Sequence, residues 1–161
     1  IELPDENQWS PTIAIGAPVM IPEHYVVDLS VRLGLYKRLS TLETDDEIES
    51  VGAELADRFG PVPDEVRQLL DIVAIKALCR RANVEKVEAG PKGVIVSFRD
   101  NSFANPAGLV SWIGEQGPQA RVRPDMKVVF VRDFADTTAR LKGSARLLRD
   151  LVRIAERKKA A

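Results

Sequence analysis

The sequence has very few of the side chains from which disulfide and metal sites are built. Its 161 residues include one cysteine, Cys79, and one histidine, His24. A single cysteine cannot form a disulfide within the chain, which agrees with a reducing compartment. Because a structural zinc site needs about four Cys or His ligands, structural zinc is excluded. We expect neither a metal nor a cofactor in this chain.

Long apolar runs and a strong net charge are also absent. No apolar stretch approaches the roughly 20 residues of a membrane helix, and the acidic start, IELPDE, lacks the basic-then-apolar order of a signal peptide. The 23 Lys and Arg residues against 24 Asp and Glu residues give a net charge of −1, so no global field attracts nucleic acid or anionic lipid. We expect a cytoplasmic protein and, because the sequence does not begin with Met, a piece of a longer one.

The local motifs of common enzymes are missing. The sequence contains no G-x-x-x-x-G-K-[ST], G-x-G-x-x-G, H-E-x-x-H or G-x-S-x-G. Cys79 and His24 would have to form any Cys–His pair, but Cys79 falls in an apolar helical stripe, where a thiol stays protonated and inert. We therefore expect no catalysis by this chain. A small enzyme with a site assembled between the two halves remains an alternative.

The sequence has the composition of an ordinary globular protein, with 45% hydrophobic and 29% charged residues. The spacing of its apolar residues changes along the chain and divides the chain into parts. Residues 1–27 are spaced by proline and predict an extended lead-in or tether, with short apolar runs at 12–15 and 19–21. Residues 28–83 have helical periodicity, and residues 84–161 alternate strand-like and helical segments. We predict that 28–161 form a single domain with a helical part and a sheet-containing part.

Local signals mark the three helices of the helical part. Asp28 is an N-cap for a helix with a broad apolar surface that ends near Thr41. The T-x-x-E pattern from Thr44 to Glu47 predicts a capping box, and the helix it opens ends at Gly60. The third helix begins at 63–65 and has two opposite apolar stripes, which predicts a central helix covered on both sides. Those stripes are Val66, Leu69, Leu70, Val73 and Ala77 on one side and Ile72, Ile75 and Cys79 on the other.

The second half predicts the order ββαββα. Segments 84–89 and 94–98 read as strands joined by a G-P-K-G turn, and a short helix follows Asn105. Segments 121–123 and 127–131 read as a second strand pair, and the last helix is capped by Asp136. The predicted fold class is therefore α+β: an N-terminal strand or tether and a helical part, then a half with a mixed or antiparallel sheet and a long C-terminal helix.

Two charged helix faces are candidate binding sites. At about 100° per residue, Glu47, Glu54 and Asp57 point away from the apolar stripe of the second helix. Arg58 follows Glu54 by four residues and can partly neutralise this face. The face is either simply solvated or a negative patch that pairs with basic residues of a partner.

The last helix carries the opposite charge. Its basic stripe consists of Arg146, Arg149, Arg153 and Arg157, followed by Lys158 and Lys159. Cations near a helix C-terminus complement the helix dipole, and they can also contact phosphate or an acidic partner. No aromatic residue interleaves with the stripe to stack on bases. A nucleic-acid-binding module that uses this helix is the alternative to a protein-binding function.

Three strings give the sequence a resemblance to a known family. They are P-E-H-Y-V at 22–26, R-L-G-L-Y-K-R-L at 32–39 and D-R-F-G-P-V-P at 57–63. Together, and at this spacing, they resemble the C-terminal domain of bacterial transcription-repair coupling factors, and the resemblance continues through 92–98 and 105–106. It covers nearly the whole chain.

The resemblance implies a function in DNA repair. The parent protein is an ATP-driven double-stranded DNA translocase that displaces stalled RNA polymerase and recruits nucleotide excision repair, and its motor domains, with their ATP and Mg²⁺, are absent here. The terminal domain is implied to be a non-catalytic, autoinhibitory domain. It packs on an excinuclease-B-like N-terminal module and hides the surface that binds the excinuclease A protein. The acidic residues implied to make this contact are Glu54 and Asp57, with Glu47 and Arg58 beside them.

Overall fold

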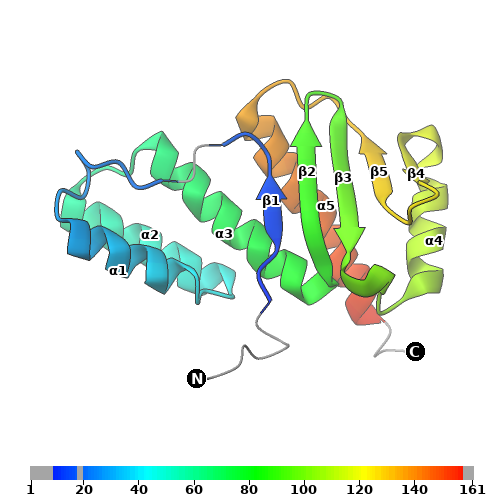
Figure 1. The fold of residues 1–161 in the computed structure, drawn as a ribbon, viewed down its shortest axis with the longest axis horizontal. Coiled ribbons are helices and arrows are strands. Elements are labelled where there is room, and N and C mark those ends of the chain that lie inside the picture. Colours follow the sequence, from blue (N-terminus) through cyan, green and yellow to red (C-terminus); the bar gives the residue numbers. More distant parts are fainter. Residues whose placement is uncertain (1–8, 18–19, 158–161) are drawn as a thin grey trace.

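The computed structural model describes residues 9–17 and 20–157, which form a helical part beside a five-stranded sheet (Figure 1). Residues 1–8 of the expected lead-in, Val19 of its second apolar run, and Lys158 and Lys159 lie outside the described residues. In chain order the elements are β1 (Thr12–Ala14), α1 (Leu29–Leu39), α2 (Asp45–Phe59), α3 (Asp64–Ala82), β2 (Val84–Gly90), β3 (Gly93–Phe98), α4 (Pro106–Glu115), β4 (Ala120–Val122), β5 (Val128–Val131) and α5 (Thr137–Arg157).

The sheet has the strand order β1-β2-β3-β5-β4. β1 runs parallel to β2, and the other neighbours are antiparallel, so the sheet is mixed. The hairpin between β2 and β3 needs glycine at its end: Gly93 has a φ of +142°, and a Cβ there would lie 2.0 Å from the Phe130 carbonyl oxygen. The predicted α+β class and the ββαββα order are confirmed. β1 realises the expected lead-in strand, whereas Met20 and Ile21 lie in irregular structure.

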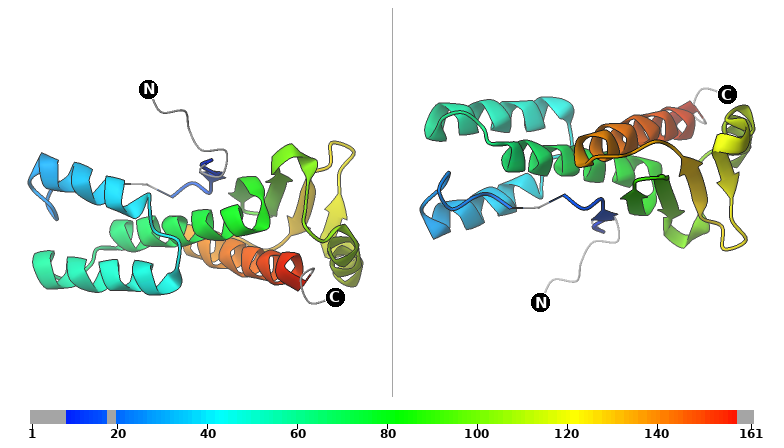
Figure 2. Two further views of the ribbon diagram at one scale, coloured as in Figure 1. Left: turned by 90° about the horizontal axis from the view of Figure 1, so that it is seen from below. Right: turned by 90° about the horizontal axis from the view of Figure 1, so that it is seen from above.

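One face of the sheet is covered by helices. Side chains alternate along the strands, so that Val94, Val96, Val128 and Phe130 are buried while Ile95 is partly exposed. The buried face packs against α3 and α5, which lie side by side behind the sheet (Figure 2). The ring of Trp112, from α4, packs 5.3 Å from that of Phe130.

The predicted local signals of the helical part are present. The Asp28 side chain accepts a hydrogen bond from the Val31 N–H, and Thr44 and Glu47 form the reciprocal capping box. α1 buries Leu35 and Leu39, but Leu29 and Leu33 on its apolar surface are exposed. Among residues 9–17 and 20–157, the broad apolar surface of the first helix is therefore only partly covered.

α3 is the central helix that its two apolar stripes predict. Val66, Leu69 and Val73 belong to a core shared with α1 and α2. Ile75 and Cys79 belong to the larger core under the sheet. Because one rigid helix contributes to both cores, the helical part and the sheet cannot move apart without exposing apolar surface.

α5 begins where Asp136 predicts. The Asp136 carboxylate accepts a hydrogen bond of 2.7 Å from the Ala139 N–H. The helix has a broad buried face because it packs against both the sheet and α3. Its buried residues are Leu141, Ser144, Leu147, Leu148, Leu151, Val152, Ile154 and Ala155. The domain division at 27/28 and 83/84 stays a prediction, although β1, which precedes residue 28, is part of the same sheet.

Candidate functional site

The acidic face of α2 is the candidate site, and Glu47 stands at its beginning. The Glu47 Oε1 accepts hydrogen bonds from the Thr44 N–H at 3.2 Å and from the Thr44 hydroxyl at 3.0 Å. In return the Glu47 N–H donates to the Thr44 hydroxyl oxygen at 3.1 Å. Glu47 therefore fixes the start of α2, and its carboxylate is already occupied within the chain.

Glu54 is held by two arginines. Its Oε2 accepts hydrogen bonds from Arg38 of α1 at 2.7 Å and from Arg58 at 3.3 Å, and the Glu54 side chain is 35% exposed. The hydrogen bond from Arg38 is the main reason that the pKa of Glu54 lies below its usual range. The partial neutralisation expected from Arg58 is confirmed, whereas sequence reasoning missed Arg38. Arg38 stands in the R-L-G-L-Y-K-R-L string, but no local spacing could pair it with a residue 16 positions away.

Asp57 is the most available carboxylate of the face. Its side chain is exposed, and the part of the chain that the structure describes gives it no ion pair. Glu54, Asp57 and Arg58 therefore form a small surface of alternating charge, in which Arg38 and Arg58 orient Glu54 and leave Asp57 open to solvent. We call this set the α2 charged face.

The end of α2 is rigid because Tyr25 ties it down. The Tyr25 hydroxyl lies 3.0 Å from the Leu55 carbonyl oxygen and 2.9 Å from that of Gly60, to which it donates. Its ring packs against Phe59, and the Arg58 guanidinium lies 4.8 Å from the Phe59 ring centre. The P-E-H-Y-V and D-R-F-G strings, which carried the resemblance, thus meet here and position the α2 charged face.

The other candidate residues lie elsewhere. Arg146, Arg149, Arg153 and Arg157 lie on α5, and Arg153 pairs with Asp150 at 2.9 Å. Cys79 is fully buried, and burial raises the pKa of its thiol to about 12, while His24 is on the surface. The structure therefore does not bring Cys79 and His24 together as a nucleophile pair.

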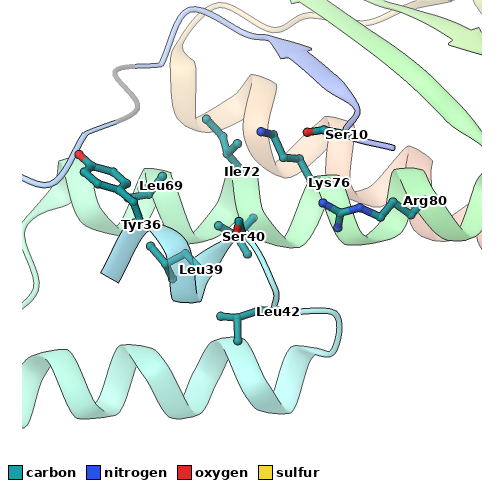
Figure 3. A pocket seen from close by; sticks show the side chains of 10 residues that line it. Ser10, Tyr36, Leu39, Ser40, Leu42, Leu69, Ile72, Lys76 and Arg80 are labelled. Carbon is teal, nitrogen blue, oxygen red and sulfur yellow. The ribbon is translucent and has the colours of Figure 1, made fainter. Parts of the chain in front are cut away.

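A small pocket opens where the lead-in, α1 and α3 meet (Figure 3). Its volume is about 160 Å³, and its walls are mostly apolar, with Lys76 and Arg80 on one side. Ser10 and Ser40 add hydroxyls. Among the described residues that line it there is no carboxylate, histidine or cysteine. Within residues 9–17 and 20–157, no group of three or more His, Cys, Asp or Glu side chains could hold a metal ion, and no helix is long and apolar enough to cross a membrane.

Comparison with known proteins gives one consistent family. The family model described as the TRCF domain matches residues 15–109. The transcription-repair-coupling factor of Rickettsia conorii is 37% identical over 131 residues, which are 81% of this chain and 12% of that protein. The protein of the same name from Escherichia coli strain K12 is 28% identical over 149 residues, 92% of this chain and 13% of that protein. The chain thus spans about an eighth of the length of these relatives.

A solved structure shares the fold. A crystal structure of the C-terminal domain of transcription-repair coupling factor superposes with a TM-score of 0.76 and 21% sequence identity. The match covers 92% of this chain and 95% of the other. The resemblance that rested on three strings is therefore confirmed by the match to the family model and by relatives that cover most of the chain. This chain belongs to the TRCF domain family of transcription-repair coupling factors, proteins of transcription-coupled DNA repair.

Proposed function

We propose that this chain is a non-catalytic regulatory domain of a larger transcription-repair coupling factor. In this proposal it packs on an excinuclease-B-like N-terminal module of the same protein and masks the surface that binds the excinuclease A protein. The chain spans only about an eighth of the length of its relatives. Most of the protein surface on which this domain could pack would therefore belong to the rest of the parent protein. The parent's contacts with RNA polymerase and double-stranded DNA, its ATP and Mg²⁺, and a cytoplasmic location belong to the same proposal.

The observation that carries the proposal is the exposed Asp57 beside a pre-oriented Glu54. Arg38 and Arg58 hold the Glu54 carboxylate, so little side-chain entropy is lost when a partner's basic residue approaches. Asp57 is fully able to accept from a partner's Arg or Lys. Arg58 uses only one of its nitrogens, Nη1, to donate to Glu54, so its other N–H groups can donate to a partner's carboxylate.

Charge pairs alone would make a weak contact. An exposed pair contributes about 0.2–1 kcal/mol, so the contact also needs apolar burial. Val27, just before the helical part, and Leu29 and Leu33 of α1 offer it, because these residues are 77%, 60% and 58% exposed. Apolar side chains exposed this far gain most from being covered by another surface.

A modest contact suffices when both surfaces belong to one chain. A flexible linker gives an effective concentration of about 1 mM. A contact with an intrinsic dissociation constant of about 0.1 mM would then be closed in about nine molecules of ten. Opening would cost about 1.4 kcal/mol, which binding of polymerase or DNA by the parent can supply.

The test uses the full-length parent protein. We expect that Glu54→Ala combined with Asp57→Ala raises the affinity for the excinuclease A protein several-fold in calorimetry, while circular dichroism shows unchanged folding. The matched control is Glu43→Ala combined with Glu49→Ala, which removes the same charge from positions near the start of α2. Unchanged affinity in the first variant, or an equal increase in the control, would rule out this role of the α2 charged face.

A further inference from the structure

A groove runs between α3 and α5 on the side away from the sheet. The two helices lie side by side in both views of Figure 2, and the groove between them has a volume of about 480 Å³. Asp71 and Ala74 of α3 form one wall, and residues from Leu141 to Arg153 of α5 form the other. The Arg81 guanidinium of α3 and the Glu156 carboxylate of α5, 2.6 Å apart, join the helices toward their C-terminal ends.

The α5 wall carries four cations in one row. Lys142, Arg146, Arg149 and Arg153 follow one another at spacings of four, three and four residues, so they lie on one helix face. At a rise of 1.5 Å per residue the row is about 16 Å long. This row includes most of the basic stripe that the sequence indicates, and adds Lys142.

Carboxylates within the groove neutralise the row only in part. Asp150 pairs with Arg153 at 2.9 Å. Among the residues that the structure describes, no carboxylate lies within 4.0 Å of Lys142, Arg146 or Arg149. Asp71 is near enough to Lys142 and Arg149 for both to lower its pKa, but burial has the larger effect and the pKa is raised. The groove thus keeps a net positive charge of two, four cations less two carboxylates.

The groove also has apolar lining residues. They are Ala74 of α3 and Leu141 and Ala145 of α5, beside the row of cations. A ligand that fits must therefore offer negative charge along one edge and small apolar groups beside it. That is the pattern of an amphipathic helix with acidic residues at three- and four-residue spacings.

We propose that the α3–α5 groove is a docking site for an acidic amphipathic helix of a protein partner, whose carboxylates pair with Lys142, Arg146 and Arg149 while its apolar side chains cover Ala74 and Ala145. This surface is independent of the α2 charged face, so the proposal does not rest on the regulatory function above.

The groove suits such a helix better than it suits nucleic acid. Double-stranded DNA presents a phosphate charge about every 1.7 Å of its axis, so phosphates would lie against Asp71 and Asp150 as well as against the cations. A helix can place a neutral side chain opposite each of these carboxylates. The apolar lining residues offer no hydrogen bond or charge to a phosphate backbone, and none of the described residues that line the groove is aromatic and able to stack on bases.

Fluorescence anisotropy with the 161-residue chain tests the proposal. The probe is a labelled synthetic helix with Glu at the four-three-four spacing and Leu and Ala on the adjoining face, and its control peptide has Gln in place of Glu. Arg146→Gln combined with Arg149→Gln should weaken binding of the Glu peptide about 2- to 30-fold, the range for two exposed charge pairs. Lys92→Gln combined with Arg121→Gln removes the same charge from exposed positions outside the groove and off α5, and should leave binding within twofold.

The same titration with a DNA duplex of mixed sequence at low salt separates the two classes of ligand. The proposal requires chemical-shift changes at Ala74 and Ala145 on peptide binding and weaker binding of the Gln peptide. It is overturned if the Glu peptide does not bind, if both peptides bind equally, or if the groove and control variants behave alike. The proposal is also overturned, in favour of a nucleic-acid ligand, if the duplex binds more tightly than the Glu peptide and this binding is lost in the variant with Arg146→Gln and Arg149→Gln.

Discussion

Gly143 of α5 is a position where the effect of an alanine can be worked out from the structure. In the middle of an exposed helix, Gly→Ala stabilises by up to about 1 kcal/mol because alanine loses less backbone entropy on folding. At Gly143, however, an added Cβ would lie 2.3 Å from both Cε1 and Cζ of the Phe134 ring. The Phe134 ring thus occupies the space into which a side chain at position 143 would project.

The Phe134 ring cannot retreat by a small backbone shift. The Phe134 N–H donates to the Pro91 carbonyl at 2.9 Å, and its carbonyl accepts from Arg140 Nε at 3.0 Å. The ring must therefore rotate out of the core, in which it is only 7% exposed. Overpacking of this kind costs about 1–3 kcal/mol, and the gain in helix propensity offsets up to about 1 kcal/mol. Starting from the middle of that overpacking range, about 2 kcal/mol, and subtracting the gain in propensity, we expect Gly143→Ala to destabilise the protein by about 1–2 kcal/mol.

Thermal and urea unfolding measure this effect against a matched glycine. Gly34 lies in α1 with no atom within 4 Å of an added Cβ, so Gly34→Ala should stabilise slightly. For a chain of this size, Gly143→Ala should lower the melting temperature by about 2–8 °C. In a Phe134→Leu background the penalty of Gly143→Ala should shrink, because the smaller side chain leaves room. If Gly143→Ala and Gly34→Ala raise the melting temperature alike, the steric reasoning is refuted.

Three further outcomes follow from named contacts. The buried Cys79 thiol, with its pKa raised to about 12, should react with Ellman's reagent at pH 8 only in denaturant; rapid reaction of the native chain would contradict this. Tyr25→Phe should cost about 1 kcal/mol in urea unfolding, because the hydroxyl that bonds to Leu55 and Gly60 is lost; an unchanged midpoint would show that these bonds contribute nothing. Burial raises the pKa of Asp71 in the folded protein, so the free energy of unfolding falls as pH rises from the ordinary Asp pKa through this raised pKa. The Asp71→Asn variant should therefore be more stable than the unsubstituted protein near pH 7 and equally stable below the ordinary Asp pKa. A stability difference that grows in acid would contradict this prediction.

Much of the fold could be predicted from the sequence because its signals are local. A capping box joins residues three positions apart, so Thr44 and Glu47 predict the start of α2 without any knowledge of the rest of the chain. The two apolar stripes of α3 predict a helix covered on both sides, and the two cores that meet there confirm it. The acidic face of α2 also follows from helical periodicity.

The candidate sites could be predicted less fully, because exposure and pairing depend on what lies opposite. The sequence places Glu47, Glu54 and Asp57 on one face as equivalent carboxylates. In the structure Glu47 holds a helix end, Glu54 is held by arginines, and only Asp57 is open. The partner that distinguishes Glu54 is Arg38, which comes from another helix.

By itself, the sequence determined the element order, the caps, the two-sided central helix and, through three strings, the family. These depend on spacings of a few residues, which the chain carries in any conformation. Only the tertiary structure decided that Arg38 reaches Glu54, that Asp71 lies near Lys142 and Arg149, and that α3 and α5 enclose a groove. Ion pairing, desolvation and grooves arise between segments far apart in the chain, so their energies are fixed only when packing brings those segments together.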